Sequence, residues 1–114
     1  MTSRIQHLEF GKIVVDNKEY TDTDLVVFWN SVEKCEKTHK PILDEIKKIC
    51  LKNPEIIIIS TGFSDCVKVS EEIENYLKNK KIELIKMKTP DATKRFKELI
   101  SQGKQAAVRI HTTC

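Results

Sequence analysis

The sequence is poor in residues that interrupt regular structure, and it has no long hydrophobic run. Three of its 114 residues are glycine and three are proline, which excludes a collagen-like fibre and a low-complexity linker. The longest apolar runs, Leu25–Trp29 and Ile56–Ile59, have the length of strands, whereas a membrane-spanning helix needs about 20 residues. We therefore expect a globular chain and no membrane partner.

The sequence also lacks a large excess of charge of either sign. Lys and Arg number 20 and Asp and Glu number 17, so the net charge is +3, an excess too small to indicate a nucleic-acid partner. Basic residues gather in the second half of the chain. Acidic residues lie among them and no exposed aromatic platform is expected nearby, which favours solvated helix faces. These basic residues are Lys78, Lys80, Lys81, Lys86, Lys88, Lys94, Arg95 and Lys97.

Targeting signals and closely spaced cysteines are missing too. Residues 1–7 contain no signal-peptide hydrophobic region, and Glu9 and Asp16 interrupt any Arg-rich, acid-poor presequence, so we expect a cytoplasmic protein. The four cysteines form no C-x-x-C pair, and in a reducing cytosol we expect them to be free thiols. They are Cys35, Cys50, Cys66 and Cys114.

The residues that are present suit one α/β domain. Hydrophobic residues make up 39% of the chain and charged residues 32%, so we expect one core in a single domain spanning residues 1–114. In the first third, β-rich runs predict strands over residues 10–15, 18–21 and 24–29, with a weaker fourth strand over residues 31–37.

From Pro41 the hydrophobic period becomes that of a helix. Apolar residues at i, i+4, i+7 and i+8 share one helical face. They are Ile42, Ile46, Ile49 and Cys50. The Asn53–Pro54 step ends this helix, because a residue before proline avoids the α region.

The rest of the chain alternates between strand and helix. Residues 56–59 are apolar at every position, which predicts a strand buried on both sides within a sheet covered by helices. A helix over residues 70–80, a strand over 82–87, a helix over 89–103 and a strand over 106–110 follow. Such crossovers are long enough for parallel pairing, and right-handed connections place helices on both faces.

Two helix starts carry recognisable capping chemistry. Ser70 is a suitable N-cap and acidic residues follow it, whereas Thr89 is a suitable N-cap followed by Pro90 at the first helical position. The inner faces are expected to be Ile73, Tyr76 and Leu77 in the first helix, and Ala92, Phe96, Leu99 and Ile100 in the second.

The first candidate site is the loop Thr61–Asp65, which follows the most buried strand. Ligands of open α/β sheets bind beyond the carboxyl ends of the strands. We therefore predict ligand binding at Thr61, Gly62, Phe63, Ser64 and Asp65, with hydroxyl groups and free amides able to hold an anion. The alternative is a tight turn in which Gly62 supplies a positive φ. The loop completes neither a G-x-S-x-G nucleophile motif nor a phosphate-binding P-loop.

The second candidate is the pair His111 and Cys114. A histidine beside a thiol can activate it as thiolate, and H-x-x-C spacing could supply two zinc ligands. The alternative is a purely structural role, in which these residues form a strand end that is held by packing. Because zinc needs three or four ligands and the other cysteines are scattered along the chain, we expect no metal. We also expect no cofactor and no catalytic residue.

The third candidate is the step Phe28–Trp29. Strict alternation along a strand places these two side chains on opposite faces of the sheet. One of them could then anchor a partner protein, although buried aromatics of this kind are equally often part of the core.

Four motifs in order carry a family resemblance. They are Phe10-Gly11-Lys12-Ile13, Thr61-Gly62-Phe63-Ser64, Thr89-Pro90-Asp91-Ala92 and His111-Thr112-Thr113-Cys114. With this order and spacing the chain resembles the Mth nine-three-eight domain family over nearly its whole length. Ser60 stands where the family often has a glycine or another small residue, and Phe96-Lys97 stands where it often has Tyr-Asn.

The resemblance implies a compact three-layer α/β fold with a mixed central sheet, extra N-terminal antiparallel strands and no established catalytic activity. One branch of the family is linked to assembly of respiratory complex I, and the other to adipocyte differentiation and cytoplasmic residence. The His-x-Thr-Cys ending is closer to the cytoplasmic branch. We therefore expect a non-enzymatic cytoplasmic domain that acts through a protein partner. The alternatives are a small-molecule-binding protein or enzyme that uses the loop Thr61–Asp65, and a complex I assembly factor.

Overall fold

The large sheet of the computed structural model is mixed, as expected. The structure describes residues 4–114. Five strands pair in the order β5 (Val32–Cys35), β4 (Asp24–Phe28), β8 (Ala106–Ile110), β6 (Ile56–Ser60) and β7 (Glu83–Met87). β6 pairs in parallel with both β7 and β8, whereas β4 pairs antiparallel with β8 and β5.

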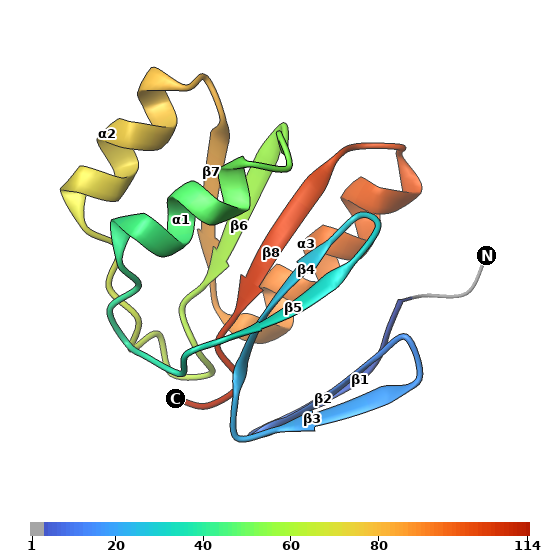
Figure 1. Cartoon of the computed structure of the whole chain (residues 1–114). Helices are drawn as coiled ribbons and strands as arrows, with labels where there is room; N and C mark the ends of the chain where they lie inside the picture. The colour runs from blue at the N-terminus through green and yellow to red at the C-terminus, as the bar shows by residue number, and fades with distance from the viewer. Residues whose placement is uncertain (1–3) are drawn as a thin grey trace.

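A smaller antiparallel sheet precedes the large one. It consists of β1 (Ile5–Glu9), β2 (Lys12–Val15) and β3 (Lys18–Thr21), joined as two hairpins. Figure 1 shows it in blue at the lower edge of the molecule, on the side of β4. The predicted three-layer α/β fold with extra N-terminal strands is therefore confirmed. The predicted domain 1–114 includes residues 1–3, which lie outside the described residues.

Three helices lie within residues 4–114 and cover both faces of the large sheet. α1 (Leu43–Cys50) and α2 (Glu71–Asn79) lie on one face, and α3 (Thr89–Ser101) lies on the other (Figure 1). The small sheet packs on the α3 side, since Ile5, Ile13 and Val15 join the same apolar cluster as α3. None of the helices in this described part is long and apolar enough to cross a membrane.

The isoleucine run explains why β6 lies in the middle of the fold. Ile56 and Ile58 face α3, whereas Ile57 and Ile59 face α1 and α2. Side chains in a strand alternate between faces, so only a run that is apolar at every position can serve two cores. The predicted strand buried on both sides is confirmed.

Helix boundaries agree with the sequence in two places. The Ser70 side chain accepts a hydrogen bond from the Ile73 amide at 3.2 Å, which confirms the predicted N-cap of α2. Gly103 has a φ of +79° just beyond α3, a conformation that ends helices and that glycine adopts without strain.

Several predicted boundaries and orientations are wrong. Strand β1 was not predicted, and the expected strand 10–15 begins only at Lys12 because Phe10 and Gly11 form the hairpin turn. Ile42 is 63% exposed, since it is the extended residue before α1 and not part of its buried face. Lys88, not Thr89, is the N-cap of α3.

The aromatic step at the end of β4 also departs from expectation. Phe28 and Trp29 share the apolar cluster on the α1 and α2 side, with ring centroids 6.2 Å apart. Alternation fails here because β4 ends at Phe28 and Trp29 lies in the turn that follows. Trp29 is half-buried, so this step belongs to the core.

Candidate functional site

The two predicted sites lie side by side at the carboxyl ends of the parallel strands. β6 leads into the loop Thr61–Asp65 and β8 leads into residues 111–114, and Figure 1 shows the carboxyl end of the chain beside that loop. The Phe63 amide donates to the Thr113 carbonyl at 2.9 Å, and the Ser64 amide donates to the Cys114 oxygen at 2.6 Å. The fold thus joins two segments that are 50 residues apart in sequence into one site.

Gly62 makes this close approach possible. Its φ is +94°, and a β-carbon on it would lie 2.2 Å from the carbonyl carbon of Cys114. Both arguments for glycine therefore apply at this position, a positive φ and the near approach of another backbone segment. The expected tight turn exists, and it serves to seat residues 113 and 114.

The predicted ligand residues differ in which of their polar groups are free to bind a ligand. The Phe63 and Ser64 amides already bind backbone oxygens, so they are not free for an anion while that segment lies there. The side chains of Ser64 and Asp65 are exposed. Thr61 is buried, and its Oγ1 has no hydrogen-bond partner among residues 4–114. Ligand binding at this loop stays a prediction.

Buried hydroxyl groups support the start of the carboxyl-terminal segment. The His111 amide donates to Ser60 Oγ at 2.7 Å, and Thr89 Oγ1 donates to the His111 carbonyl at 2.7 Å. Ser60 and Thr89 are both fully buried. The residue that departs from the family pattern, Ser60, therefore has a hydrogen-bonding role that a glycine could not fill.

The side chain of His111 is fully buried and is held by a carboxylate. Its Nδ1 lies 3.0 Å and 3.1 Å from the two oxygens of Asp24. Arg109 Nη1 donates to Asp24 at 3.1 Å, and Arg109 Nε donates to Glu45 at 2.6 Å. Charged groups this deeply buried persist only when they are paired and hydrogen-bonded. The network fixes the ring orientation of His111.

Cys114 contacts a histidine that the sequence did not single out. Its Sγ lies 2.9 Å from His39 Nε2, and the His39 ring stands edge-on to the His111 ring with centroids 4.9 Å apart. One ligand-capable atom from each of His39, His111 and Cys114 lies within 4.8 Å of the other two. The predicted pair is therefore part of a group of three, in which His39 stands closest to the thiol.

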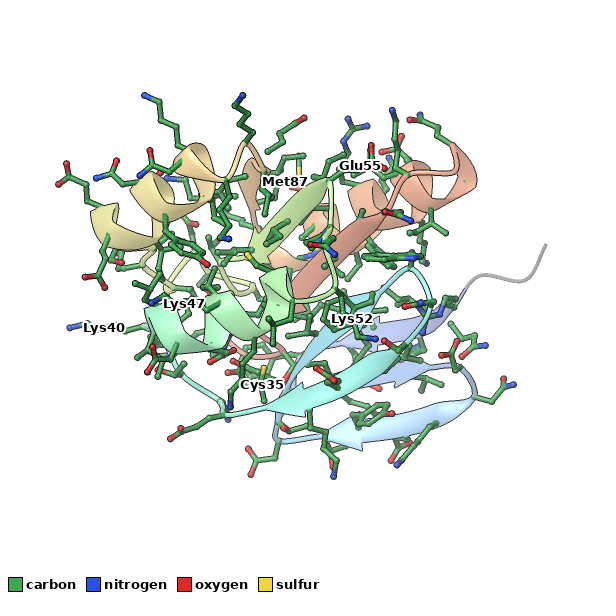
Figure 2. The ribbon with its side chains drawn as sticks, turned by 45° about the horizontal axis from the view of Figure 1, so that its top comes forward. Cys35, Lys40, Lys47, Lys52, Glu55 and Met87 are labelled. Carbon is green, nitrogen blue, oxygen red and sulfur yellow. The ribbon has the colours of Figure 1, made fainter. Side chains whose placement is uncertain are left out.

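The remaining thiols differ in reactivity. A hydrogen bond with Cys114, followed by desolvation, raises the pKa of the Cys66 thiol, whose Sγ lies 3.9 Å from the Ser64 carbonyl oxygen. Burial raises the pKa of Cys35 to about 12, and Figure 2 shows this side chain between β5 and α1. Burial also raises the pKa of Cys50, which packs in the apolar cluster under α1. Cys35 and Cys50 are thus poor nucleophiles.

Four residues around this site were not predicted from the sequence, namely Asp24, Glu45, Arg109 and His39. Arg109 carried a signal, because a charged residue inside the apolar run Ala106–Ile110 must either be exposed or paired. Asp24 stands likewise at the start of a fully buried strand. His39 lies in an irregular segment with no periodicity, so no local pattern pointed to it.

The basic residues of the second half are largely exposed, as the solvated-face interpretation predicts.

Fold and sequence together define the class of this protein. A model of the family described as "Protein of unknown function (DUF498/DUF598)" matches residues 5–111. The chain belongs to this family. Its structure is similar to that of MT938, with a TM-score of 0.78 and 23% identity over 99% of this chain and 100% of that one. The match confirms the Mth nine-three-eight resemblance.

Two further solved structures have the same fold. The conserved hypothetical protein PH1505 from Pyrococcus horikoshii OT3 matches with a TM-score of 0.86 and 25% identity, over 96% of this chain and 98% of that one. A protein from Bartonella henselae described as an outer membrane protein matches with a TM-score of 0.85 and 17% identity, over 98% and 96%. The similarity to the latter shows the fold alone.

Proposed function

We propose that this chain is a non-enzymatic cytoplasmic domain that acts through a protein partner, and that the partner binds at the aromatic pair Phe10 and Phe63. The observation that supports it is that Phe10 is 62% exposed although its backbone is firmly held. The ring centroids of the pair lie 5.6 Å apart. Aromatic residues, phenylalanine included, are enriched in protein interfaces relative to the rest of the protein surface.

Three backbone contacts make this surface rigid. The Gly11 amide, next to Phe10, donates to the Thr112 carbonyl at 2.7 Å, and the Phe63 amide donates to Thr113 at 2.9 Å. The Gly11 carbonyl accepts from the Asp22 amide at 3.3 Å. A preorganised surface loses little conformational entropy on binding, which favours affinity. The same contacts use the loop amides that an anionic substrate would need, and this favours binding to a protein over catalysis.

The proposal predicts that Phe10→Ala removes the partner. We expect proteins captured stoichiometrically from cytoplasmic extract by the wild-type chain to be lost with Phe10→Ala, with binding at least about tenfold weaker. Quantitative affinity capture followed by titration of the recovered protein measures this. Ile42→Ala is the matched control, because Ile42 is 63% exposed, as much as Phe10, but is the residue before α1 and not part of the aromatic pair.

Two results would contradict the proposal. One is undiminished capture by Phe10→Ala and by the Phe10→Ala/Phe63→Ala double variant. The other is turnover of a defined substrate that Ser64→Ala or Cys114→Ala abolishes. Cell fractionation tests the compartment, since a mitochondrial signal would favour the complex I assembly alternative.

A small-molecule site at the loop Thr61–Asp65 is the second candidate. The buried Thr61 Oγ1 without a partner among residues 4–114 favours it, because such a group is costly unless something satisfies it. We expect a true ligand at about 100 times its dissociation constant to add roughly 2.7 kcal/mol and raise the melting temperature by several degrees. Thermal unfolding against nucleotides and metabolites measures this, and Asp65→Ala should erase the shift. No shift across the panel would remove this candidate.

A further inference from the structure

We propose that His39, His111 and Cys114 form a binding site for a zinc ion. These three residues bring ligand-capable atoms within 4.8 Å of one another. Two imidazole nitrogens and one thiolate fill three of the four tetrahedral positions of zinc, and water can take the fourth. The sequence alone pointed away from a metal, because these three residues are spread over most of the chain.

The distances suit such an ion with small adjustments. Zinc binds sulfur at about 2.3 Å and histidine nitrogen at about 2.0–2.1 Å, so tetrahedral ligand atoms stand roughly 3.3–3.8 Å apart. The contact between Cys114 Sγ and His39 Nε2 is 2.9 Å, and the three ligand atoms span at most 4.8 Å. Rotation of the exposed His39 side chain and of the half-buried Cys114 side chain is enough to close the difference.

The surroundings of His111 match the second shell of a metal site. Asp24 holds Nδ1 at 3.0 Å, which leaves Nε2 as the free ligand atom, next to Thr113 Oγ1 at 3.2 Å. Metal-binding histidines nearly always donate their other ring nitrogen to a carboxylate or a carbonyl group. Arg109 in turn holds Asp24 at 3.1 Å. The metal-binding nitrogen of a buried histidine held in this way is preorganised for the ion.

The backbone around the other ligands is held as well. The Thr38 amide donates to Asp24 Oδ2 at 3.3 Å, and the Lys68 amide donates to the His39 carbonyl at 2.9 Å. Asp24 therefore orients His111 and also fixes the residue before His39. The amides of Phe63 and Ser64 seat the Cys114 backbone. An ion could enter from solvent, because His39 is exposed and Cys114 is half-buried.

Cobalt(II) is the probe that tests the site. Added to the reduced, metal-free full chain, it should bind one ion per chain and give the intense visible bands of tetrahedral Co²⁺ with a near-ultraviolet sulfur-to-metal band. Zinc should displace it. We expect His39→Gln and Cys114→Ser each to weaken binding by at least about 100-fold, since even second-shell losses cost 10–100-fold.

The chain offers matched controls. His7→Gln changes an exposed histidine on β1 whose Nε2 lies 3.0 Å from Glu9 Oε1, and Cys50→Ala removes a thiol outside the group. Both should retain the cobalt spectrum, and a melting curve of each variant shows that it is folded. The proposal is overturned if Co²⁺ gives a weak octahedral spectrum without a sulfur band. It is equally overturned if folded His39→Gln binds as tightly as the wild type, or if His7→Gln loses binding to the same extent.

Discussion

At the scale of single residues, Gly62 shows how one missing side chain creates the site. Its φ of +94° and the 2.2 Å approach of the Cys114 carbonyl carbon leave no room for a β-carbon. Gly103 is the useful contrast, because its φ is +79° and nothing lies within 4 Å of a β-carbon placed on it. The two glycines share a positive φ, but only Gly62 has other atoms close to the position of a β-carbon.

We therefore expect Gly62→Ala to destabilise the fold more than Gly103→Ala. The left-handed backbone costs about 1–2 kcal/mol in either variant, and displacement of the carboxyl-terminal segment should add about 1–3 kcal/mol at Gly62 alone. Urea denaturation measures both. Equal losses of free energy of unfolding in the two variants would show that residues 113 and 114 adapt freely.

At the scale of secondary-structure elements, the hydrophobic pattern was sufficient wherever an element has a strong period. The apolar run at residues 56–59 and the stripes of α2 and α3 predicted the correct elements, because burial on a given face leaves a periodic trace in sequence. β1 left no such trace. Of its five residues only Ile5 is buried, and a half-exposed edge of a small sheet needs little apolar content.

Element ends were harder to predict, and the reason is tertiary. Thr89 has the chemistry of an N-cap, yet its hydroxyl group donates to the His111 carbonyl across the sheet. Lys88 takes the cap position without a side-chain hydrogen bond. A long-range partner thus outweighed the local N-cap preference of Thr89. A sequence window of a few residues does not contain that partner.

At the scale of the whole molecule, Arg109 ties several elements together. It lies on β8 at the centre of the large sheet and binds Asp24 of β4, Glu45 of α1 and the Glu36 carbonyl at 3.1 Å. Its side chain is fully buried, as is that of Asp24. Removal of one partner from such a network leaves an uncompensated buried charge.

We expect Arg109→Ala to cost about 3–5 kcal/mol of stability and to loosen His111 through Asp24. Lys86→Ala is the control, because Lys86 pairs with Glu74 at 2.9 Å in a half-exposed position where loss of the pair costs under about 1 kcal/mol. Denaturant unfolding compares the two variants. A cost for Arg109→Ala no larger than that for Lys86→Ala would mean that water replaces the lost guanidinium.

The sequence by itself determined the fold class, the family and the location of the central strand, because hydrophobic periodicity and turn chemistry are local properties of the chain. It also pointed to the loop Thr61–Asp65 and to the pair His111 and Cys114 as separate features. Only the tertiary structure decided that these lie in one place and that His39 and Asp24 complete them. Contacts such as that between Asp24 and His111, which are 87 positions apart, depend on strand order and on charge pairing inside the core, and neither leaves a periodic signal in the chain.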